Sequence, residues 1–235
     1  METGKNILII GGSGGIGSKI TQLLSDEPVR LYLVSRSQQS GDSDNITAIS
    51  ADIARDDLSD KLPDMLNSVV YCPGSINLRP FHQYKDQDFL DDYNINVMGA
   101  VRVLRSALPA LKKAEHPASV VLFSTVAVQT GLPYHASIAA AKGAIEGLTR
   151  SLAAEWAPRI RVNAIAPSIT DTPMAARLLS TESKQNASAQ RHPLKRYGKA
   201  DDIADMAVYL LSDKASWITG QILHIDGGLS TLKPV

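Results

Sequence analysis

A glycine-rich heptapeptide, residues 11–17, is the first part of the sequence that could do chemistry. It follows a short apolar run at 7–10 and precedes a segment, 16–24, whose apolar residues recur with helical period. At such a turn, backbone N–H groups and the positive end of a helix converge, which suits a pyrophosphate. Two glycine spacings fit, through Gly12, Gly14 and Gly17 or through Gly11, Gly15 and Gly17. The sequence predicts a dinucleotide site, with a merely flexible loop as the alternative.

The residues after the second predicted strand bear on which dinucleotide binds. About twenty residues past the turn, a cofactor with a free ribose 2′-hydroxyl favours an Asp or Glu. This sequence has Ser35, Arg36 and Ser37 there. A guanidinium flanked by hydroxyls can chelate a 2′-phosphate, which a carboxylate would repel. The triplet favours NADP over NAD, and the alternative is an ordinary solvated arginine.

These residues need a scaffold, and the order of apolar runs predicts one. The predicted strands span 7–10, 29–34, 46–50, 69–71, 119–123, 160–166 and 221–225, and the predicted helices span 16–24, 58–66, 89–111, about 137–156 and about 202–211. Continuously apolar short strands are typical of a sheet buried on both faces. We predict a single α/β domain over residues 1–235, a doubly wound, mostly parallel seven-stranded sheet with helices on both faces. This Rossmann fold binds ligands at the carboxyl ends of its strands.

Composition limits the possible classes of protein. Of 235 residues, 44% are hydrophobic and 20% are charged, which is a globular balance. The 24 Lys and Arg residues balance 24 Asp and Glu, so no net field attracts nucleic acid. Cys72 is the only cysteine, which suits a reducing compartment and rules out a cysteine-rich metal site. The run at 7–10 is too short for a signal-peptide core or a membrane span. We expect a cytoplasmic protein without a metal, acting on a small molecule and not on nucleic acid or a membrane.

In the wider glycine spacing the chain resembles the short-chain dehydrogenase/reductase family over nearly its whole length. The matching segments, in family order, are residues 11–17, 52–53, 74, 94–99, 163–172, 220–221 and 226–228. Ile10, the run 71–73 and Ser168 depart from the family pattern. The resemblance implies a Rossmann fold and an NAD(P)-dependent oxidoreductase. It also implies a homotetramer or dimer built through the long helices around Asn96 and Lys142.

The resemblance further implies which residues contact the cofactor. The glycine turn would hold the diphosphate, Asp52 and Ile53 the adenine, and Lys142 the nicotinamide ribose. Ile169 and Thr172 align with residues that hold the carboxamide and the diphosphate. With Ser35 and Arg36 added from their own chemistry, the expected cofactor-binding residues are Gly11, Ser13, Gly15, Ile16, Gly17, Ser35, Arg36, Asp52, Ile53, Gly74, Lys142, Pro167, Ile169 and Thr172.

The same family typically reduces a carbonyl with a Ser, a Tyr and a Lys, the last two spaced as Tyr-x-x-x-Lys. Residues at i and i+4 share a helix face, so the lysine's charge lowers the phenol's pKa. Here Lys142 matches the lysine, Asn96 the active-site asparagine, and Thr125 replaces the serine. Ile138 stands four residues before Lys142, and its side chain cannot transfer a proton.

Two routes would let such a site remain active. The first is a substitute acid in the loop before the helix, where Tyr134 is the first to test, beside His135 and Ser137. The second is a substrate with a conjugated C=C, whose reduction leaves an enolate that oxyanion donors can hold. The stretch 123–156 also resembles the dienoyl-CoA reductase branch of the family, whose acid lies elsewhere. Ala127 occupies that branch's tyrosine position here.

The sequence therefore predicts an NADP-dependent oxidoreductase for a small carbonyl or conjugated, enoyl-type substrate, with a substrate lid around 174–196. The catalytic candidates are Asn96, Thr125, Lys142 and Tyr134. Asp91 and Asp92 are excluded as an acid/base dyad, because neighbours on a helix point apart. The alternative is a weak or inactive dinucleotide-binding module that acts as a sensor or partner subunit.

Overall fold

The computed structural model describes residues 4–36 and 45–233 of the chain. Seven strands form one sheet in the order β3-β2-β1-β4-β5-β6-β9, and all neighbouring pairs are parallel. The strands are β1 (Lys5–Ile10), β2 (Val29–Ser35), β3 (Ile46–Ser50), β4 (Ser68–Tyr71), β5 (Ala118–Phe123), β6 (Ile160–Pro167) and β9 (Ile222–Ile225). A separate parallel pair joins β7 (Thr170–Asp171) to β8 (Gly198–Lys199). The sheet confirms the predicted doubly wound α/β fold.

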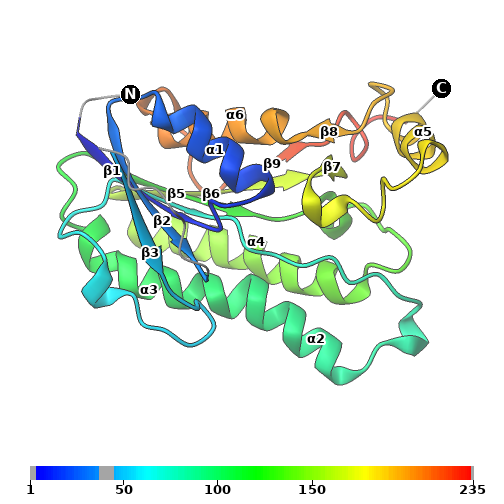
Figure 1. The fold of residues 1–235 in the computed structure, drawn as a ribbon, viewed down its shortest axis with the longest axis horizontal. Coiled ribbons are helices and arrows are strands. Elements are labelled where there is room, and N and C mark those ends of the chain that lie inside the picture. The colour runs from blue at the N-terminus through cyan, green and yellow to red at the C-terminus, as the bar shows by residue number, and fades with distance from the viewer. Residues whose placement is uncertain (1–3, 37–44, 234–235) are drawn as a thin grey trace.

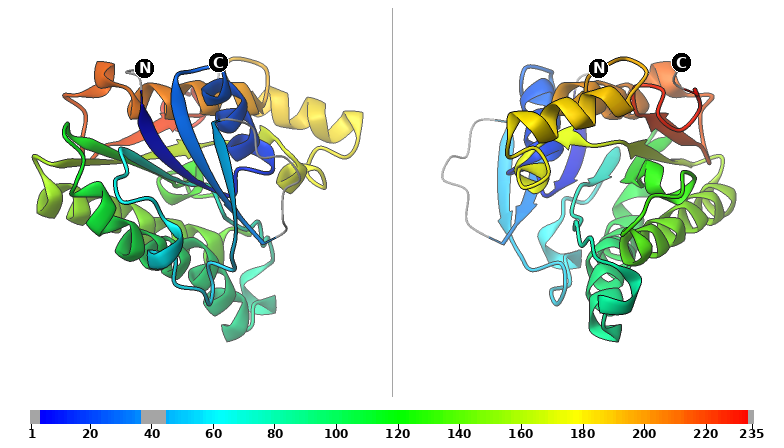
Figure 2. Two further views of the ribbon diagram at one scale, coloured as in Figure 1. Left: turned by 60° about the vertical axis from the view of Figure 1, so that its left-hand side comes forward. Right: turned by 90° about the vertical axis from the view of Figure 1, so that its right-hand side faces the viewer.

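Helices cover both faces of the sheet (Figure 1). On one face lie α1 (Gly15–Ser25) and α6 (Ala200–Leu211), and on the other α2 (Asp86–Tyr93), α3 (Gly99–Leu111) and α4 (Ala136–Trp156). The remaining helix, α5 (Glu182–Arg191), lies at the end of the molecule where β7 and β8 lie (Figure 2). Because neighbouring strands are parallel, each connection must cross a face of the sheet before the next strand begins.

The core has two halves because successive side chains of a strand point to opposite faces. In β1, Ile7 and Ile9 join the apolar cluster under α1 and α6, and Leu8 and Ile10 join the cluster under α3 and α4. All four side chains are buried. A strand that is apolar at every position therefore stabilises both layers, as the sequence pattern predicted.

The predicted helix over 58–66 is wrong. Only Ser59–Lys61 form a 3₁₀ turn, and Leu62 is already extended, with φ −91° and ψ 154°. Pro63 follows Leu62, lacks an N–H donor and disfavours the helical conformation of the residue before it. Leu58 and Leu66 are nevertheless buried in the core. The two leucines therefore hold an irregular segment against the core, and their spacing does not reflect one face of a helix.

The long helical pattern predicted over 89–111 is present with an irregular centre. It begins at Asp86 in α2 and continues through a π-helical turn, Asn94–Met98, into α3. A π turn inserts one extra residue into the helix and is common at functional sites. This one carries Asn96.

Candidate functional site

The glycine-rich turn lies at the switch point of the sheet, where β1 has β2 on one side and β4 on the other. Gly11 has φ of +76°, a left-handed conformation that favours glycine. A Cβ on Gly17 would clash with the carbonyl oxygen of Gly11. The turn therefore closes onto the start of α1 only because both positions lack a side chain.

The outer side of this turn is open to a ligand. Ser13 and Gly14 are exposed, and a Cβ on Gly14 would meet no described atom within 4 Å. Gly14 is the N-cap of α1 and has no side chain to bond the first N–H groups of the helix. Gly15 faces Thr172, whose Cβ would lie 3.4 Å from a Cβ built on that glycine. The N-terminus of α1 therefore lies uncapped by any side chain between the glycine turn and Thr172, and its N–H groups are available to bind a diphosphate.

The residues predicted to bind the adenosine half of the cofactor lie at the same edge of the sheet as the glycine turn. Ser35 ends β2, and the exposed Arg36 follows it, while Ser37 lies outside the described residues. Asp52 follows the end of β3, the strand paired with β2, and its carboxylate accepts a backbone N–H two residues on at 3.0 Å. Ile53 is half-buried against the core. Arg36 and Asp52 therefore follow neighbouring strand ends.

Two polar side chains meet at the exit of β4. A Cβ built on Gly74 would lie 3.2 Å from Asn96 Oδ1 and 3.5 Å from Lys142 Nζ. Gly11, in the cofactor turn, lies against the same segment, because its own Cβ would contact Cys72 and Pro73. The carbonyl oxygen of Asn96 and the ammonium of Lys142 therefore face one short stretch of backbone beside the glycine turn.

Lys142 is 8% exposed and projects from α4 toward the carboxyl end of β5. Its Nζ donates a hydrogen bond to the carbonyl oxygen of Phe123 at 2.8 Å. Burial lowers the pKa of Lys142 to about 8, against the opposing effects of Cys72 and Asp92. Burial also raises the pKa of the Cys72 thiol to about 12, so that thiol is neutral at pH 7. The lysine keeps most of its charge at neutral pH and can donate to a ligand hydroxyl.

Asn96 is fully buried in the π turn. Its Nδ2 donates to the backbone oxygen of Asp92 at 2.7 Å and to Ser75 Oγ at 3.0 Å. Its Oδ1 has no hydrogen-bond partner within the described part of the chain. Because buried acceptors are almost always satisfied, this oxygen, which lies against Gly74, is suited to receive a donor from a ligand or a water.

Sequence reasoning missed a buried acid beside Asn96. Asp92 is 3% exposed, and its two carboxylate oxygens accept hydrogen bonds from Ser75 Oγ and Ser137 Oγ, each at 2.6 Å. Asp91 is exposed, so the two neighbours do point apart as predicted. The available signal was the spacing of four residues between Asp92 and Asn96, which puts both on one helix face.

Thr125 and Ile138 lie on either side of the loop that joins β5 to α4. The Thr125 side chain caps a 3₁₀ turn, Val126–Val128, by accepting the N–H of Ala127 at 3.3 Å. Its hydroxyl hydrogen remains able to donate to a substrate oxygen. Ile138 is buried in the first turn of α4, one turn before Lys142. The surroundings of Lys142 on that side are therefore apolar.

The three candidate substitute acids have different surroundings. Because α4 begins at Ala136, Tyr134 and His135 lie in the preceding loop. Tyr134 has φ of +71° and a side chain that is 57% exposed. His135 Nδ1 lies 2.7 Å from a backbone carbonyl two residues earlier. Ser137 is buried and donates its hydroxyl to Asp92. Of the three, Ser137 is bound to another side chain of the site and Tyr134 extends into solvent.

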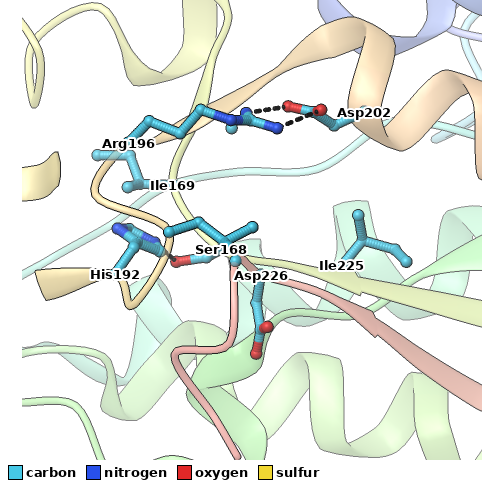
Figure 3. A pocket seen from close by; sticks show the side chains of 10 residues that line it. Ser168, Ile169, His192, Arg196, Asp202, Ile225 and Asp226 are labelled. Carbon is cyan, nitrogen blue, oxygen red and sulfur yellow. Dashed lines mark hydrogen bonds and ion pairs between the residues drawn. The ribbon is translucent and has the colours of Figure 1, made fainter. Parts of the chain in front are cut away.

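The end of β6 carries the residues predicted to hold the nicotinamide. Pro167 is its last residue, and Thr172 is the N-cap of a 3₁₀ turn, Pro173–Ala175. Between them, Ser168 Oγ lies 2.8 Å from Nε2 of His192 (Figure 3). Ser168 and Ile169 both line a small cavity of about 110 Å³. The segment is thus fixed by a contact that the sequence did not reveal.

His192 links this segment to the predicted lid. It is buried, and its Nδ1 lies 2.7 Å from the backbone oxygen of Ser188 in α5. A carbonyl oxygen only accepts, so Nδ1 carries the hydrogen, and in the neutral ring Nε2 accepts from Ser168. The range 174–196 includes α5, which Thr181 caps by accepting the N–H of Lys184 at 3.3 Å. The segment predicted as a lid therefore contains one α-helix, α5, and is tied to the end of β6 through His192.

The described residues form neither a metal-ligand cluster nor a membrane-spanning helix. Within residues 4–36 and 45–233, no three His, Cys, Asp or Glu side chains cluster as metal ligands would. No helix in this described part is long and apolar enough to cross a membrane.

The arrangement fits a dinucleotide. The open N-terminus of α1 suits the diphosphate, and the buried ammonium of Lys142 and the unpartnered oxygen of Asn96 lie beside it at Gly74. Thr172 closes the opposite side of the turn. Parallel strands of this fold bind such ligands at their carboxyl ends, where all of these groups lie.

Comparison with known proteins supports the same class. The sequence matches a family profile described as enoyl-(acyl carrier protein) reductase over residues 11–230. A tropinone reductase homolog of Arabidopsis thaliana is 31% identical over an alignment of 247 positions, which covers 97% of this chain and 93% of that protein. A solved short-chain dehydrogenase/reductase from Brucella melitensis, described as a glucose/ribitol dehydrogenase, has a TM-score of 0.89 and 30% identity over 97% of both chains. ElxO with NADP bound has a TM-score of 0.87 and 26% identity, over 97% of this chain and 99% of that one.

The profile and the full-length relatives agree with the fold and with the order of the motifs. The chain belongs to the short-chain dehydrogenase/reductase family of oxidoreductases. The resemblance drawn from the motifs is thereby confirmed at the level of the family.

Proposed function

We propose that the chain is an NADP-dependent oxidoreductase that transfers hydride to or from a small carbonyl or conjugated, enoyl-type substrate. The observation that carries this proposal is the pair of polar groups at Gly74. There the Lys142 ammonium lies beside the glycine turn with the oxygen of Asn96, which has no hydrogen-bond partner among the described residues. A hydride donor held there would have its ribose within reach of an ammonium. Two descriptions support the two substrate types: tropinone reductase homolog and enoyl-(acyl carrier protein) reductase.

The chain's own residues divide the work of holding the cofactor. The N–H groups of the turn from Gly11 to Gly17 and the N-terminus of α1 would bind the diphosphate. Arg36 would bind a ribose 2′-phosphate, because a guanidinium fits phosphate oxygens in a planar fork. Ile169 and Thr172 would orient the carboxamide from the end of β6. When bound, the reduced nicotinamide would supply the hydride.

Fewer residues are available to donate a proton to the substrate. Thr125 would hydrogen-bond the substrate oxygen, and Lys142 would keep positive charge next to it. Tyr134 is the first substitute acid to test, since it carries a phenol in the loop that precedes α4, eight residues before Lys142. Loss of a positioned general acid typically lowers the rate by ~10²–10⁴-fold. If no acid replaces it, a conjugated C=C substrate is favoured, because hydride addition then leaves an enolate that hydrogen-bond donors can hold.

A second candidate function is cofactor binding without turnover, as a sensor or partner subunit. The observation that favours it is Ile138, a buried apolar side chain one turn before Lys142. Both functions predict NADP(H) binding, so binding alone does not separate them. Only the oxidoreductase is expected to oxidise bound NADPH when a substrate is present.

The test is a single-turnover experiment with stoichiometric NADPH. Oxidation is followed by absorbance across a panel of ketones, enones and enoyl thioesters, with binding measured separately by calorimetry. An oxidoreductase consumes NADPH with at least one member of the panel, and Tyr134→Phe then shows whether that tyrosine supplies the proton. Binding without consumption supports the second function. The absence of heat with NADPH and with NADH, from folded protein, contradicts both.

We also propose that copies of the chain associate into a dimer or tetramer through the face that carries α3 and α4. Beside it, Leu90, Tyr93 and Ile95 are large apolar side chains that are each more than two-fifths exposed. Light scattering at micromolar concentration tests this association, and the mass of a monomer would contradict it.

A further inference from the structure

Asp92 has no role in the proposed reaction, yet it is buried at the junction of three segments. It belongs to α2, while its hydrogen-bond donors Ser75 and Ser137 follow β4 and begin α4. Both bonds are 2.6 Å long, the range of a hydroxyl that donates to a charged oxygen. Because burial of a carboxylate costs stability unless it is hydrogen-bonded, the two serines hold the charge in place.

The same acid fixes the amide of Asn96. Its backbone oxygen accepts one N–H of Asn96 at 2.7 Å, and Ser75, which also donates to the Asp92 carboxylate, lies 3.0 Å from the same nitrogen. Because Nδ2 of Asn96 makes both of these hydrogen bonds, the other end of the amide, Oδ1, is the end that faces Gly74. The Oδ1 of Asn96 is therefore aimed at the site.

The charge of Asp92 also acts on Lys142. Burial lowers the pKa of that lysine, and the apolar side chain of Ile138 lies one turn before it on α4. Its hydrogen-bond acceptor, the carbonyl of Phe123, is neutral. The negative charge of Asp92 works in the opposite direction and favours the ammonium.

Other ionisable groups around the pair do not supply that charge at pH 7. Burial raises the pKa of the Cys72 thiol, at the end of β4, and desolvation raises the pKa of the Tyr84 phenol, which faces Asp92. Glu146, one turn after Lys142, pairs with Arg150 at 3.2 Å and accepts from Ser124 at 2.8 Å.

We infer that Asp92 is a positioning residue of the site. Its backbone oxygen holds Asn96 directly, its carboxylate holds Asn96 through Ser75, and its charge favours the ammonium form of Lys142 beside Ile138. This inference rests on the proposed function, because it assigns the ammonium to a nicotinamide ribose. It gives a role to a buried carboxylate whose hydrogen-bond donors lie 17 and 45 residues away in the sequence.

The test is direct titration of Lys142 in full-length protein. The ¹³Cε resonances of lysine-labelled protein are followed from pH 6 to 10, with Lys142 assigned by its absence in Lys142→Met. In the wild type we expect a midpoint near 8, because burial lowers the pKa of Lys142. Asp92→Asn removes the charge and keeps the size, so we expect the midpoint to fall by about 1 unit. NADPH affinity, measured by fluorescence, should then decline at correspondingly lower pH.

The matched control is Asp91→Asn, which removes the same charge from the exposed neighbour. Asp92→Ser is the second variant if Asp92→Asn does not fold, since its hydroxyl still pairs with the two serines. A midpoint in either folded Asp92 variant equal to that of Asp91→Asn would overturn the inference. If the midpoint falls but wild-type protein binds no NADPH, the proposed function fails while the charge coupling stands.

Discussion

Arg36 is the residue on which the choice of cofactor depends. Its side chain is exposed and directly follows β2, at the carboxyl edge of the sheet where this fold binds its ligands. Replacement Arg36→Asp puts a negative charge where a 2′-phosphate would lie. Because a hydrogen bond to a charged group contributes about 1.5–3 kcal/mol, we expect NADPH binding to weaken by ~10–100-fold, with NADH binding spared or improved. Calorimetric titration with both reduced cofactors measures the ratio of affinities.

Arg159→Asp is the control for that experiment, since it makes the same charge change at an exposed position in the turn before β6, outside both the site and helices α3 and α4. It should leave both affinities unchanged. A ratio of affinities that is the same in wild type and Arg36→Asp would remove the argument for NADP.

The residues of the site differ in how far sequence could predict them. Asn96 and Lys142 could be found because their spacing and neighbours follow a family pattern, and the structure brings both to Gly74. Asp92 and His192 were not found. Each has one partner four residues away, but the side chains that they bond, Ser137 and Ser168, lie 45 and 24 residues away, and such pairs depend on how elements pack.

At the scale of elements, the alternation of apolar strands and periodic helices predicted every strand of the main sheet, because burial on both faces leaves a continuous apolar run. The same pattern gave a wrong prediction where apolar residues are buried without forming a helix. Leu58 and Leu66 are buried without a helix between them, since Pro63 interrupts it. The polar segment that forms α5 shows the converse, because a Ser-rich helix with few buried residues has almost no apolar period to detect.

The π turn at Asn94–Met98 shows why element type alone does not define a site. The sequence predicted a continuous helix there, and the apolar period does not record one extra residue. The turn changes which side chains face the sheet, and it presents Asn96 to Gly74 while Asp92, four residues earlier, supports it. Local geometry of this kind is set by hydrogen bonds inside the fold, which sequence spacing does not contain.

At the scale of the whole molecule, Lys5 joins the first strand to a distant part of the chain. Its Nζ donates to both carboxylate oxygens of Asp213, at 2.9 and 2.7 Å, in the 3₁₀ turn Asp213–Ala215, 208 residues away. The hydrogen bond from Lys5 holds the pKa of Asp213 below its usual 3.8, although burial opposes this. A carboxyl group whose folded pKa is depressed stabilises the folded state above its unfolded pKa of about 3.9, and this contribution is lost as pH falls through the folded pKa.

We therefore expect Asp213→Asn to lower the free energy of unfolding by ~0.5–1 kcal/mol at pH 7, a modest loss because the Asp213 side chain is 57% exposed. The loss should shrink as pH falls from about 4, where Asp213 of the unfolded chain takes up its proton, through the lower pKa of Asp213 in the folded protein. Urea unfolding at a series of pH values measures both. Asp64→Asn is the control, since Asp64 and Lys113 lie 3.8 Å apart with both side chains largely exposed, and it should change stability by less than ~0.5 kcal/mol. A loss in Asp213→Asn that is equal at pH 7 and at pH 3 would mean that shape and not charge makes this contact stabilising.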